Sequence, residues 1–395
     1  MPRDAFILAG ARTPIGSFLG ALSTAAAVDL GALAVKTALK KAGAGGEHVD
    51  EVIMGNVVAA GLGQNPARQA AILAGIPASV GATTINKVCG SGLKAVMLAA
   101  QGIRLGESDC VVAGGMENMS LAPYLLPRAR GGYRMGNGEL VDSMIHDGLW
   151  DCYGRQHMGA YGERCADKFE FSRRQQDDFA VRSYRRALQA AADGVFAEEI
   201  VPVEISTRKG RVAVADDEEP ARFDEDKLRS LPPAFGGDGT ITAGNASSIN
   251  DGAAALVVAG ESACARLNAA PLARIVDSAT FSREPEWFTL APIGALGRLM
   301  DKTGWSVADV DLFEINEAFA VVTMAAEKEI GIPAEKVNVL GGAVALGHPI
   351  GSSGARILVT LLTALKHTGG RRGIACLCIG GGEAVAVAVE MEDAF

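Results

Sequence analysis

The sequence predicts an α/β protein built from two related halves. Segments typical of strands and helices alternate along the chain, and their order near the N-terminus recurs near the C-terminus. Alternation of this kind is typical of parallel βαβ units. The chain has 395 residues, 49% of them hydrophobic, so it has enough apolar material for more than one core.

The internal repeat contains five pairs of segments in the same order. The pairs are apolar strands at 5–9 and 273–277, helices ending near 41 and 303, strands at 50–56 and 311–316, helices starting at 91 and 353, and strands ending in glycines at 111–115 and 378–382. Helices 93–103 and 355–365 are apolar almost all round, so both must be buried. The simplest arrangement sandwiches them between two sheets, giving five layers, α/β/α/β/α, and brings their N-terminal ends together.

This repeat divides the chain into an N-terminal α/β half at 1–120, continued by 245–270, and a C-terminal α/β half at 271–395. Residues 121–244 are more charged and are interpreted as an inserted loop domain that carries ligand binding. Within it, Ser172 and Gln175 form a capping box that predicts a helix ending at Asp193-Gly194. The acidic run at 216–219 is interpreted as solvated and without chemistry.

The overall charge and the cysteine spacing exclude several classes of protein. A net charge of -9 lacks the basic field that nucleic acids or membrane surfaces require. No apolar stretch is long enough to span a bilayer, and residues 1–17 lack the pattern of a signal peptide. The seven cysteines show no C-x-x-C zinc spacing, so we expect no metal, free thiols and a cytoplasmic location.

Two glycine-rich turns carry the first candidate reactive groups. Cys89 lies where an apolar run meets a helix, and the N-terminus of a helix stabilises a thiolate. Gly90 and Gly92 leave room for a substrate carbonyl. His348, in the turn Gly347-His348-Pro349, is a candidate base for the thiol. A buried structural cysteine and a capping or surface histidine are the alternatives at these two positions.

Two further segments add candidate groups. Cys378 ends an apolar strand before three glycines, whose N–H groups can hold an oxyanion, although strand core followed by a tight turn is equally compatible. Cys376 shares its face and is assigned to packing. Asn316 follows an apolar strand and either serves the site or caps the next helix. The small polar segment 243–252 suits contact with a flexible ligand or acts as a linker.

Taken together, these motifs resemble those of the thiolases. They are V-C-G-S-G at 88–92, N-E-A-F at 316–319, G-H-P-I-G at 347–351 and C-x-C-x-G-G-G at 376–382, and the resemblance covers essentially the whole chain. It implies that Cys89 attacks acetyl-CoA while His348 accepts its proton, and that Cys378 deprotonates a second acetyl-CoA. It also implies that Asn316 holds a water at the enolate, and that the backbone N–H groups of Cys89 and Gly380 hold the oxyanion.

The resemblance extends to the binding of coenzyme A. Gln156-His157-Met158-Gly159 is similar to the type that forms acetoacetyl-CoA. The implied contacts with substrate and CoA are His157, Met158, Arg222, Ala243, Ser247, Ala318 and Phe319. Two positions depart from the family pattern: Ser248 replaces a usual glycine, and Trp150 lies in a segment unlike the common biosynthetic sequences, where it could reshape the acyl end of the pocket.

The leading hypothesis is therefore an acyltransferase of fatty acid metabolism that catalyses reversible Claisen condensation of two acetyl-CoA. It would use acyl-CoA as a small-molecule partner, need no cofactor and form a homotetramer, with 127–138 as a candidate tetramer loop. The nearest alternative is a degradative 3-ketoacyl-CoA thiolase for longer acyl chains. A non-catalytic CoA or lipid binder and a zinc-binding redox protein are the alternatives from other classes.

Overall fold

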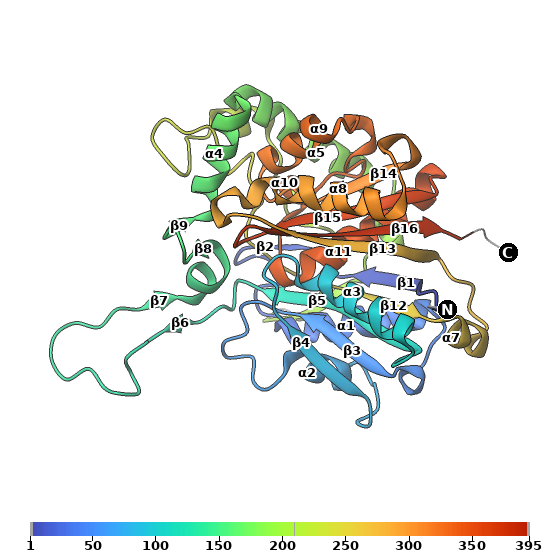
Figure 1. The fold of residues 1–395 in the computed structure, drawn as a ribbon. Coiled ribbons are helices and arrows are strands. Elements are labelled where there is room, and N and C mark those ends of the chain that lie inside the picture. The colour runs from blue at the N-terminus through green and yellow to red at the C-terminus, as the bar shows by residue number, and fades with distance from the viewer. Residues whose placement is uncertain (1–2, 209, 393–395) are drawn as a thin grey trace.

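Two α/β halves lie face to face in the computed structural model, which describes residues 3–208 and 210–392 (Figure 1). Helices α3 (Ser91–Leu105) and α11 (Ile350–Thr368) lie between the strands of the two halves and pack against each other. Helix α1 (Ala27–Lys41) covers the outer face of one half, and α8 (Ala291–Thr303) covers the other. The predicted five-layered α/β/α/β/α arrangement is confirmed.

The remaining core elements complete each half. In the first half these are β1 (Phe6–Arg12), β2 (Gly16–Ser17), β3 (Glu51–Gly55), α2 (Pro66–Leu73), β4 (Gly81–Ile85), β5 (Cys110–Asn118), β12 (Asn250–Ala259) and α7 (Glu261–Leu267). In the second half they are β13 (Ala273–Ser282), β14 (Leu312–Ile315), α9 (Ala320–Ile330), α10 (Ala343–Leu346), β15 (Arg372–Ile379) and β16 (Glu383–Met391).

The strands are mixed, so the expectation of purely parallel βαβ units is wrong. The order is β14-β15-β16-β13-β1-β12-β5-β3-β4, and only the pairs β14–β15, β3–β4 and β3–β5 of this path are parallel. The two expected sheets are also joined, because Phe6 and Ile7 of β1 pair with Arg274 and Ala273 of β13. The orders β1-β12-β5-β3 and β13-β16-β15-β14 match strand for strand, as expected for a duplicated fold.

A short glycine turn explains why the second half is not all parallel. Residues 380–382 connect β15 directly to β16, and a connection of this length joins only antiparallel neighbours. Gly381 and Gly382 have φ values of +90° and +88°, which side chains rarely adopt. The turn that follows Cys378 is thus a hairpin, and the strand β16 beyond it was not predicted.

The two central helices approach each other through glycines. A Cβ atom on Gly354 of α11 would lie 2.3 Å from the backbone nitrogen of Leu93 on α3, and one on Gly92 would lie 2.7 Å from the nitrogen of Ala355. Since α3 starts two residues after Cys89 and α11 two residues after His348, this crossing controls how far apart the two reactive residues lie.

The region between β5 and β12 is irregular and carries several short elements. They are β6 (Tyr124–Leu125), β7 (Val141–Asp142), a π-helix (Met144–Leu149), β8 (Trp150–Asp151), β9 (Gln156–His157), α4 (Met158–Phe169), α5 (Arg173–Ala192), β10 (Val203–Thr207), β11 (Gly210–Val214) and α6 (Glu225–Ser230). The Ser172–Gln175 capping box is present and α5 ends before Asp193, as predicted.

Only Asp216 of the acidic run 216–219 is exposed, so the sequence-based interpretation of the run as solvated is wrong for the other three residues. The Asp217 carboxylate accepts hydrogen bonds from the buried guanidinium of Arg12 at 2.7 and 2.8 Å. Glu218 accepts from the backbone nitrogens of Ser17 and Ala21 at 3.0 and 2.9 Å. The run therefore ties the inserted region to the β1–β2 connection, a partnership between distant segments that sequence spacing does not reveal.

No helix among the described residues is long and apolar enough to cross a membrane.

The helix crossing leads to a stability prediction. Gly354→Ala places a methyl group against the α3 backbone, so we expect the free energy of unfolding to fall by about 1–3 kcal/mol. Urea unfolding followed by circular dichroism measures the change.

Gly102→Ala is the matched control, because Gly102 also lies in α3 but a Cβ there would have no neighbour within 4 Å. Ala is favoured over Gly inside a helix, so this variant should be as stable as the unmodified chain or gain up to about 1 kcal/mol. Equal effects at the two positions would show that the crossing is not tightly packed.

Candidate active site

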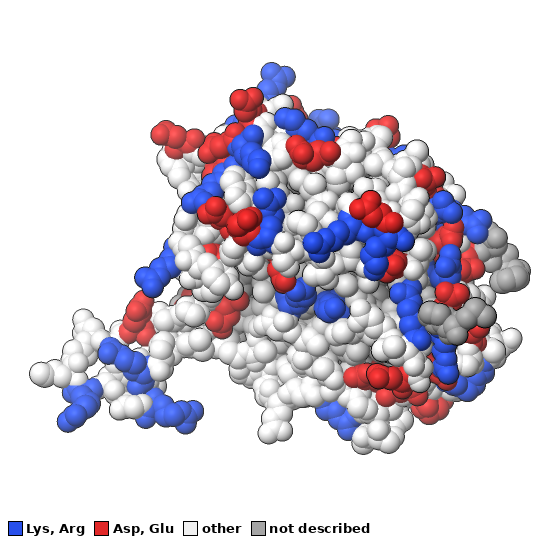
Figure 2. Space-filling view, viewed as in Figure 1, with Lys and Arg blue, Asp and Glu red and all other residues white. Residues whose placement is uncertain are grey.

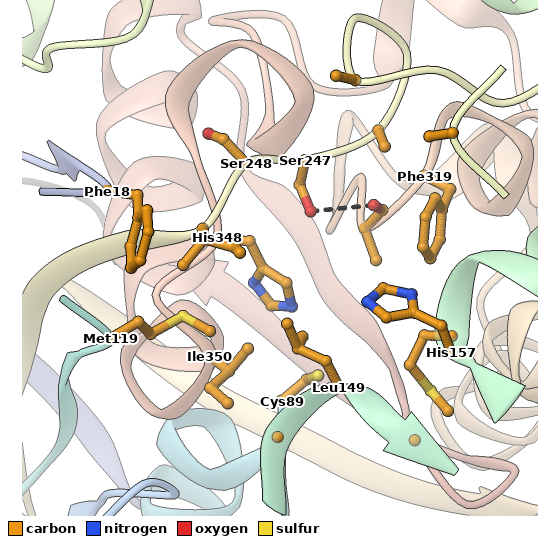
Figure 3. A pocket seen from close by; sticks show the side chains of 18 of the residues that line it. Phe18, Cys89, Met119, Leu149, His157, Ser247, Ser248, Phe319, His348 and Ile350 are labelled. Atoms are coloured by element: carbon orange, nitrogen blue, oxygen red, sulfur yellow. Dashed lines mark hydrogen bonds between the residues drawn. The ribbon is translucent and has the colours of Figure 1, made fainter. Parts of the chain in front are cut away.

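One cavity of ≈ 430 Å³ brings together residues that are far apart in the sequence. Cys89, His348, Cys378 and Gly380 all line it. Figure 3 shows Cys89 and the rings of His348 and His157 around the same space. The predicted convergence of two thiols and an imidazole on one site is therefore present in the structure.

Cys89 sits in a strained turn at the start of α3. Val88 has a φ of +46°, which is unusual for a β-branched residue. The Ser91 hydroxyl stabilises the turn by accepting from the Lys87 nitrogen at 2.8 Å and donating to the Val88 carbonyl at 2.6 Å. Burial raises the pKa of the Cys89 thiol to about 11, although N–H groups of Gly380 and Cys89 oppose this shift. The resting sulfur is therefore a neutral thiol.

His348 has one unprotonated ring nitrogen, Nε2. Ser353 Oγ lies 2.9 Å from the carbonyl of Pro349, which can only accept, so the hydroxyl hydrogen points there. The same Oγ lies 2.6 Å from His348 Nδ1, which therefore donates to it. Nε2 keeps its lone pair and is buried with no hydrogen-bond partner within the described ranges. Burial and the charge of Arg356 lower the pKa of His348 to about 3, so the ring is neutral.

The turn that carries His348 is fixed from both sides. Its backbone nitrogen donates to Asn250 Oδ1 at 2.9 Å, at the start of β12. The nitrogen of Gly351 donates to Glu117 Oε2 at 2.9 Å, and the same carboxylate accepts from the nitrogens of Val57 and Val58. Strands of the first half thus position a histidine that belongs to the second half.

Cys378 ends β15 as a second neutral thiol in the cavity. Burial, followed by the nearby thiols of Cys89 and Cys376, raises its pKa well above the ordinary value. Cys376 lies in the apolar core, outside the residues that line the cavity, in agreement with its assignment to packing. Of the two cysteines on this face of the strand, Cys378 is the one that reaches the site.

Asn316 takes a position behind the imidazole. Its side chain is buried, with Nδ2 3.5 Å from His348 Nδ1, and it is not among the residues that line the cavity. It does not cap α9, because Phe319 occupies the N-cap position of that helix and Asn316 lies three residues earlier. Asn316 therefore contacts the site through His348.

All seven predicted substrate-contacting residues line the cavity: His157, Met158, Arg222, Ala243, Ser247, Ala318 and Phe319. His157 Nδ1 accepts from the nitrogen of Gly159 at 3.2 Å, and its ring stacks on Phe235 with centroids 4.8 Å apart. Burial lowers the pKa of His157, so this ring is a neutral donor through Nε2. Ser247 Oγ donates to the carbonyl of Ala318 at 2.9 Å (Figure 3).

Arg222 lies at the cavity with a half-exposed side chain that is already paired. Its guanidinium contacts Glu218 and lies 3.8 Å from Glu219. An anionic ligand would therefore compete with these carboxylates for Arg222.

Much of the apolar wall of the cavity was not predicted from the sequence. This part includes Phe18, Met119, Leu149, Phe235 and Phe288. Most of these residues lie in loops or irregular turns, where no periodic pattern marks a buried face. Ser248, one of the two departures from the family pattern, lines the cavity and donates to Asn250 Oδ1 at 2.8 Å. Trp150, the other, is 43% exposed and lies outside the cavity, and Leu149 lines the wall instead.

The cavity brings together a thiol, a neutral imidazole and backbone N–H groups at the sulfur, which are the groups that nucleophilic cysteine enzymes use, on a duplicated α/β fold. The family model "Thiolase, N-terminal domain" matches residues 5–262, and "Thiolase, C-terminal domain" matches 269–391. The chain belongs to the thiolase family.

Full-length relatives support this assignment. The chain is 53% identical to acetyl-CoA acetyltransferase 2 of Arabidopsis thaliana, over 99% of this chain and 98% of the relative. It is 50% identical to acetyl-CoA acetyltransferase of Escherichia coli (strain K12), over 98% and 99%. Among solved structures, the acetyl-CoA acetyltransferase of Bacillus anthracis is similar with a TM-score of 0.97 at 43% identity, covering 99% of each chain. The Acat5 thiolase of Ascaris suum in complex with coenzyme A has a TM-score of 0.94 at 44% identity, covering 99% of this chain and all of that one.

The hydrogen bond between His348 and Ser353 gives a test of the site. Ser353→Ala removes the acceptor for Nδ1–H and lets the proton move to Nε2, where it blocks the base. We expect alkylation of Cys89 by iodoacetamide at neutral pH to slow by about 10- to 100-fold. Peptide mass spectrometry measures the rate at Cys89 separately from the exposed Cys152.

Ser352→Ala is the matched control, since Ser352 is a neighbouring buried serine but not the partner of His348 Nδ1. It should alkylate at the unmodified rate. An unchanged rate in Ser353→Ala would contradict the assigned tautomer.

Proposed function

We propose that this chain catalyses the reversible Claisen condensation of two acetyl-CoA to acetoacetyl-CoA and CoA through an acetyl group on Cys89. The observation that carries the proposal is that Cys89, His348 and Cys378 line one cavity together. A nucleophile, a base beside it and a second proton-transferring group are what this two-stage reaction requires.

In the first stage Cys89 Sγ attacks the thioester carbonyl and its proton passes to His348 Nε2. The N–H groups of Cys89 and Gly380, which interact with the sulfur, would stabilise the oxyanion. The C–S bond to CoA breaks, and Cys378 gives its proton to the departing CoA sulfur. The acetyl-enzyme then holds a thiolate at Cys378 and a protonated His348.

In the second stage the Cys378 thiolate removes a proton from the methyl group of a second acetyl-CoA. Because burial strongly raises the pKa of Cys378, its thiolate is a strong base for this weak carbon acid. The carbanion attacks the acetyl group on Cys89, whose sulfur leaves and regains the proton from His348. All protons return to their starting positions, and His348 with a water held by Asn316 would stabilise the enolate oxygen.

The degradative 3-ketoacyl-CoA thiolase with a longer acyl pocket remains the second candidate for the same chemistry. Full-length relatives near 50% identity are named acetyl-CoA acetyltransferases, which favours the short substrate. Thiolysis of acetoacetyl-CoA and of a six- to ten-carbon 3-ketoacyl-CoA, followed spectrophotometrically, separates the two, and strong preference for the longer substrate would reject our choice.

The proposed setting of the enzyme is fatty acid metabolism in the cytoplasm, with assembly into a homotetramer. Its reaction joins and splits two-carbon units, which fits fatty acid metabolism without a cofactor. All seven cysteines are free, which fits a reducing cytoplasm.

The 127–138 segment projects from the body of the protein between β6 and β7 (Figure 1). It carries a group of exposed basic side chains (Figure 2), which are the arginines at 128, 130 and 134, and it also carries Met135, which is 92% exposed. A projecting segment of this kind suits assembly into a homotetramer.

The main prediction follows from the different roles proposed for the two thiols, with Cys89 as the nucleophile and Cys378 as the general acid and base. Cys89→Ser should block acetylation by acetyl-CoA. Cys378→Ala should still become acetylated at Cys89 but lose condensation and thiolysis by at least about 10²–10⁴-fold, because a general acid/base is missing. Mass spectrometry of the intact protein and its peptides detects the acetyl group, and ultraviolet absorbance follows turnover.

Cys376→Ala is the matched control, since this thiol is buried on the same strand but lies outside the cavity wall. Its turnover should stay within a few-fold of the unmodified enzyme. An acetyl adduct on a residue other than Cys89 would refute the proposed mechanism.

A further inference from the structure

The exposed edge of the cavity holds one cationic side chain beside two carboxylates. Arg222 is the one arginine or lysine among the described residues that line the cavity. Its guanidinium contacts Glu218 and lies 3.8 Å from Glu219, which also lines the cavity. With one positive and two negative charges, this group is net negative. The phosphate groups of a CoA thioester would therefore be attracted by Arg222 and repelled by its two neighbours.

Glu218 divides its two carboxylate oxygens between different partners. Oε1 accepts from the guanidinium of Arg222. Oε2 accepts from the backbone nitrogens of Ser17 and Ala21, at 3.0 and 2.9 Å. These two N–H groups lie at either end of a short loop, so one carboxylate connects Arg222 to the chain that follows β2.

The loop held by Glu218 forms part of the cavity wall. Phe18 lines the cavity, on the side opposite Phe319 (Figure 3). A Cβ on Gly20 would lie 2.4 Å from Glu218 Oε2, so the loop packs directly against the carboxylate. Glu218 therefore fixes the loop that carries Phe18 with one oxygen and restrains Arg222 with the other.

The proposed reaction limits how tightly the phosphate groups of CoA should be held. CoA must leave while the acetyl group stays on Cys89, and a second acetyl-CoA then enters the same cavity. Binding energy at the phosphates is shared by the entering thioester, the transition state and the departing CoA, so it does not accelerate the chemical step. Tighter binding there would mainly slow the departure of CoA. A carboxylate that pairs with the phosphate-binding cation would reduce this hold.

We propose that Glu218 is a specificity-determining residue that weakens the hold of Arg222 on the phosphate groups of CoA, and so allows CoA to leave in each catalytic cycle. The inference rests on the proposed condensation, in which CoA thioesters are the substrates. Glu218 acts through Arg222 and through its own negative charge. A thioester of pantetheine, which has the same uncharged arm but no phosphate group, is not affected by this charge.

Glu218→Gln separates the two functions of this side chain. The N–H groups of Ser17 and Ala21 only donate, so the amide oxygen takes the place of Oε2 and the amide nitrogen faces Arg222, donor against donor. The loop stays anchored while Arg222 loses its partner. We expect the Kd of free CoA, measured by isothermal titration calorimetry at low ionic strength, to fall by about two- to fivefold. The gain should shrink at about 0.5 M salt, because Arg222 is half-exposed.

S-acetylpantetheine reads the loop separately from the charge. The concentration that half-saturates acetylation of Cys89 by this substrate should be unchanged in Glu218→Gln. In Glu218→Ala the loop also loses its anchor, so this concentration should rise by about two- to tenfold. A purely structural role of Glu218 would instead weaken the binding of both ligands in both variants.

Glu390→Gln is the matched control, because it makes the same change in net charge at another carboxylate paired with arginine. Glu390 accepts from Arg274 at 2.8 Å and from Arg372 at 3.0 Å. It lies near the C-terminal end of β16, whereas the hairpin that contributes Gly380 to the cavity precedes the other end of this strand. The Kd of CoA in this variant should equal that of the unmodified enzyme.

Unchanged or weaker binding of CoA by Glu218→Gln would overturn the inference, and so would an equal gain in Glu390→Gln or with S-acetylpantetheine. If Glu218→Gln does not fold, Glu219→Gln removes the second carboxylate beside Arg222, and failure of that variant to bind CoA more tightly overturns the inference by itself. An unmodified enzyme that binds CoA but catalyses neither condensation nor thiolysis would instead refute the proposed function, so the two failures are distinguishable.

Discussion

The close packing of two buried helices is the constraint on which this structure depends. Helices α3 and α11 meet through Gly92 and Gly354, with no room for a side chain on either. The start of α11 also packs closely against a strand of the first half, because a Cβ on Gly115 of β5 would lie 2.0 Å from the carbonyl oxygen of Gly351. The helix ends that follow Cys89 and His348 are thereby forced into one place. The duplicated fold thus builds its site where the two halves meet.

The reactive groups at this junction share an electrostatic state: each is uncharged at rest. Burial raises the pKa of the Cys89 and Cys378 thiols and lowers that of His348. Forming an ion pair between these buried groups is therefore unfavourable by itself, and proton transfer becomes feasible only as bonds to a substrate form. Backbone N–H groups and the imidazole can stabilise the negative charge that develops in the transition state. Within the described residues no cluster of three or more potential metal ligands occurs.

Cys89, His348 and Cys378 were predictable from the sequence because each lies in or next to a glycine-rich turn. The glycines around Cys89, His348 and Cys378 mark tight turns at the ends of apolar strands, and such turns are visible in a single sequence. The five-layered core was predictable because helices that are apolar all round have to be buried. The family resemblance supplied the roles of the residues and the seven contacts that line the cavity.

What sequence could not supply depends on contacts between distant segments. The antiparallel direction of β16 follows from a three-residue turn whose length is evident only once both strands are known. The sequence suggests that Asp217 is a solvated charge, and only the structure shows that it pairs with the distant Arg12. Phe235 lies in an irregular loop and joins the wall of the site by stacking on His157. In the sequence Arg356 is a single polar residue on an apolar helix, and only the structure shows that it donates to Glu314 and Asn316.

The most direct test of the central claim, that both halves serve one cavity, is a crystal structure of the enzyme after exposure to acetyl-CoA. The account predicts an acetyl group on Cys89 Sγ, its oxygen held by the N–H groups of Cys89 and Gly380, and Cys378 Sγ next to the position that a second acetyl group would occupy. An acetyl group bound elsewhere, or one whose carbonyl points away from both N–H groups, would contradict it.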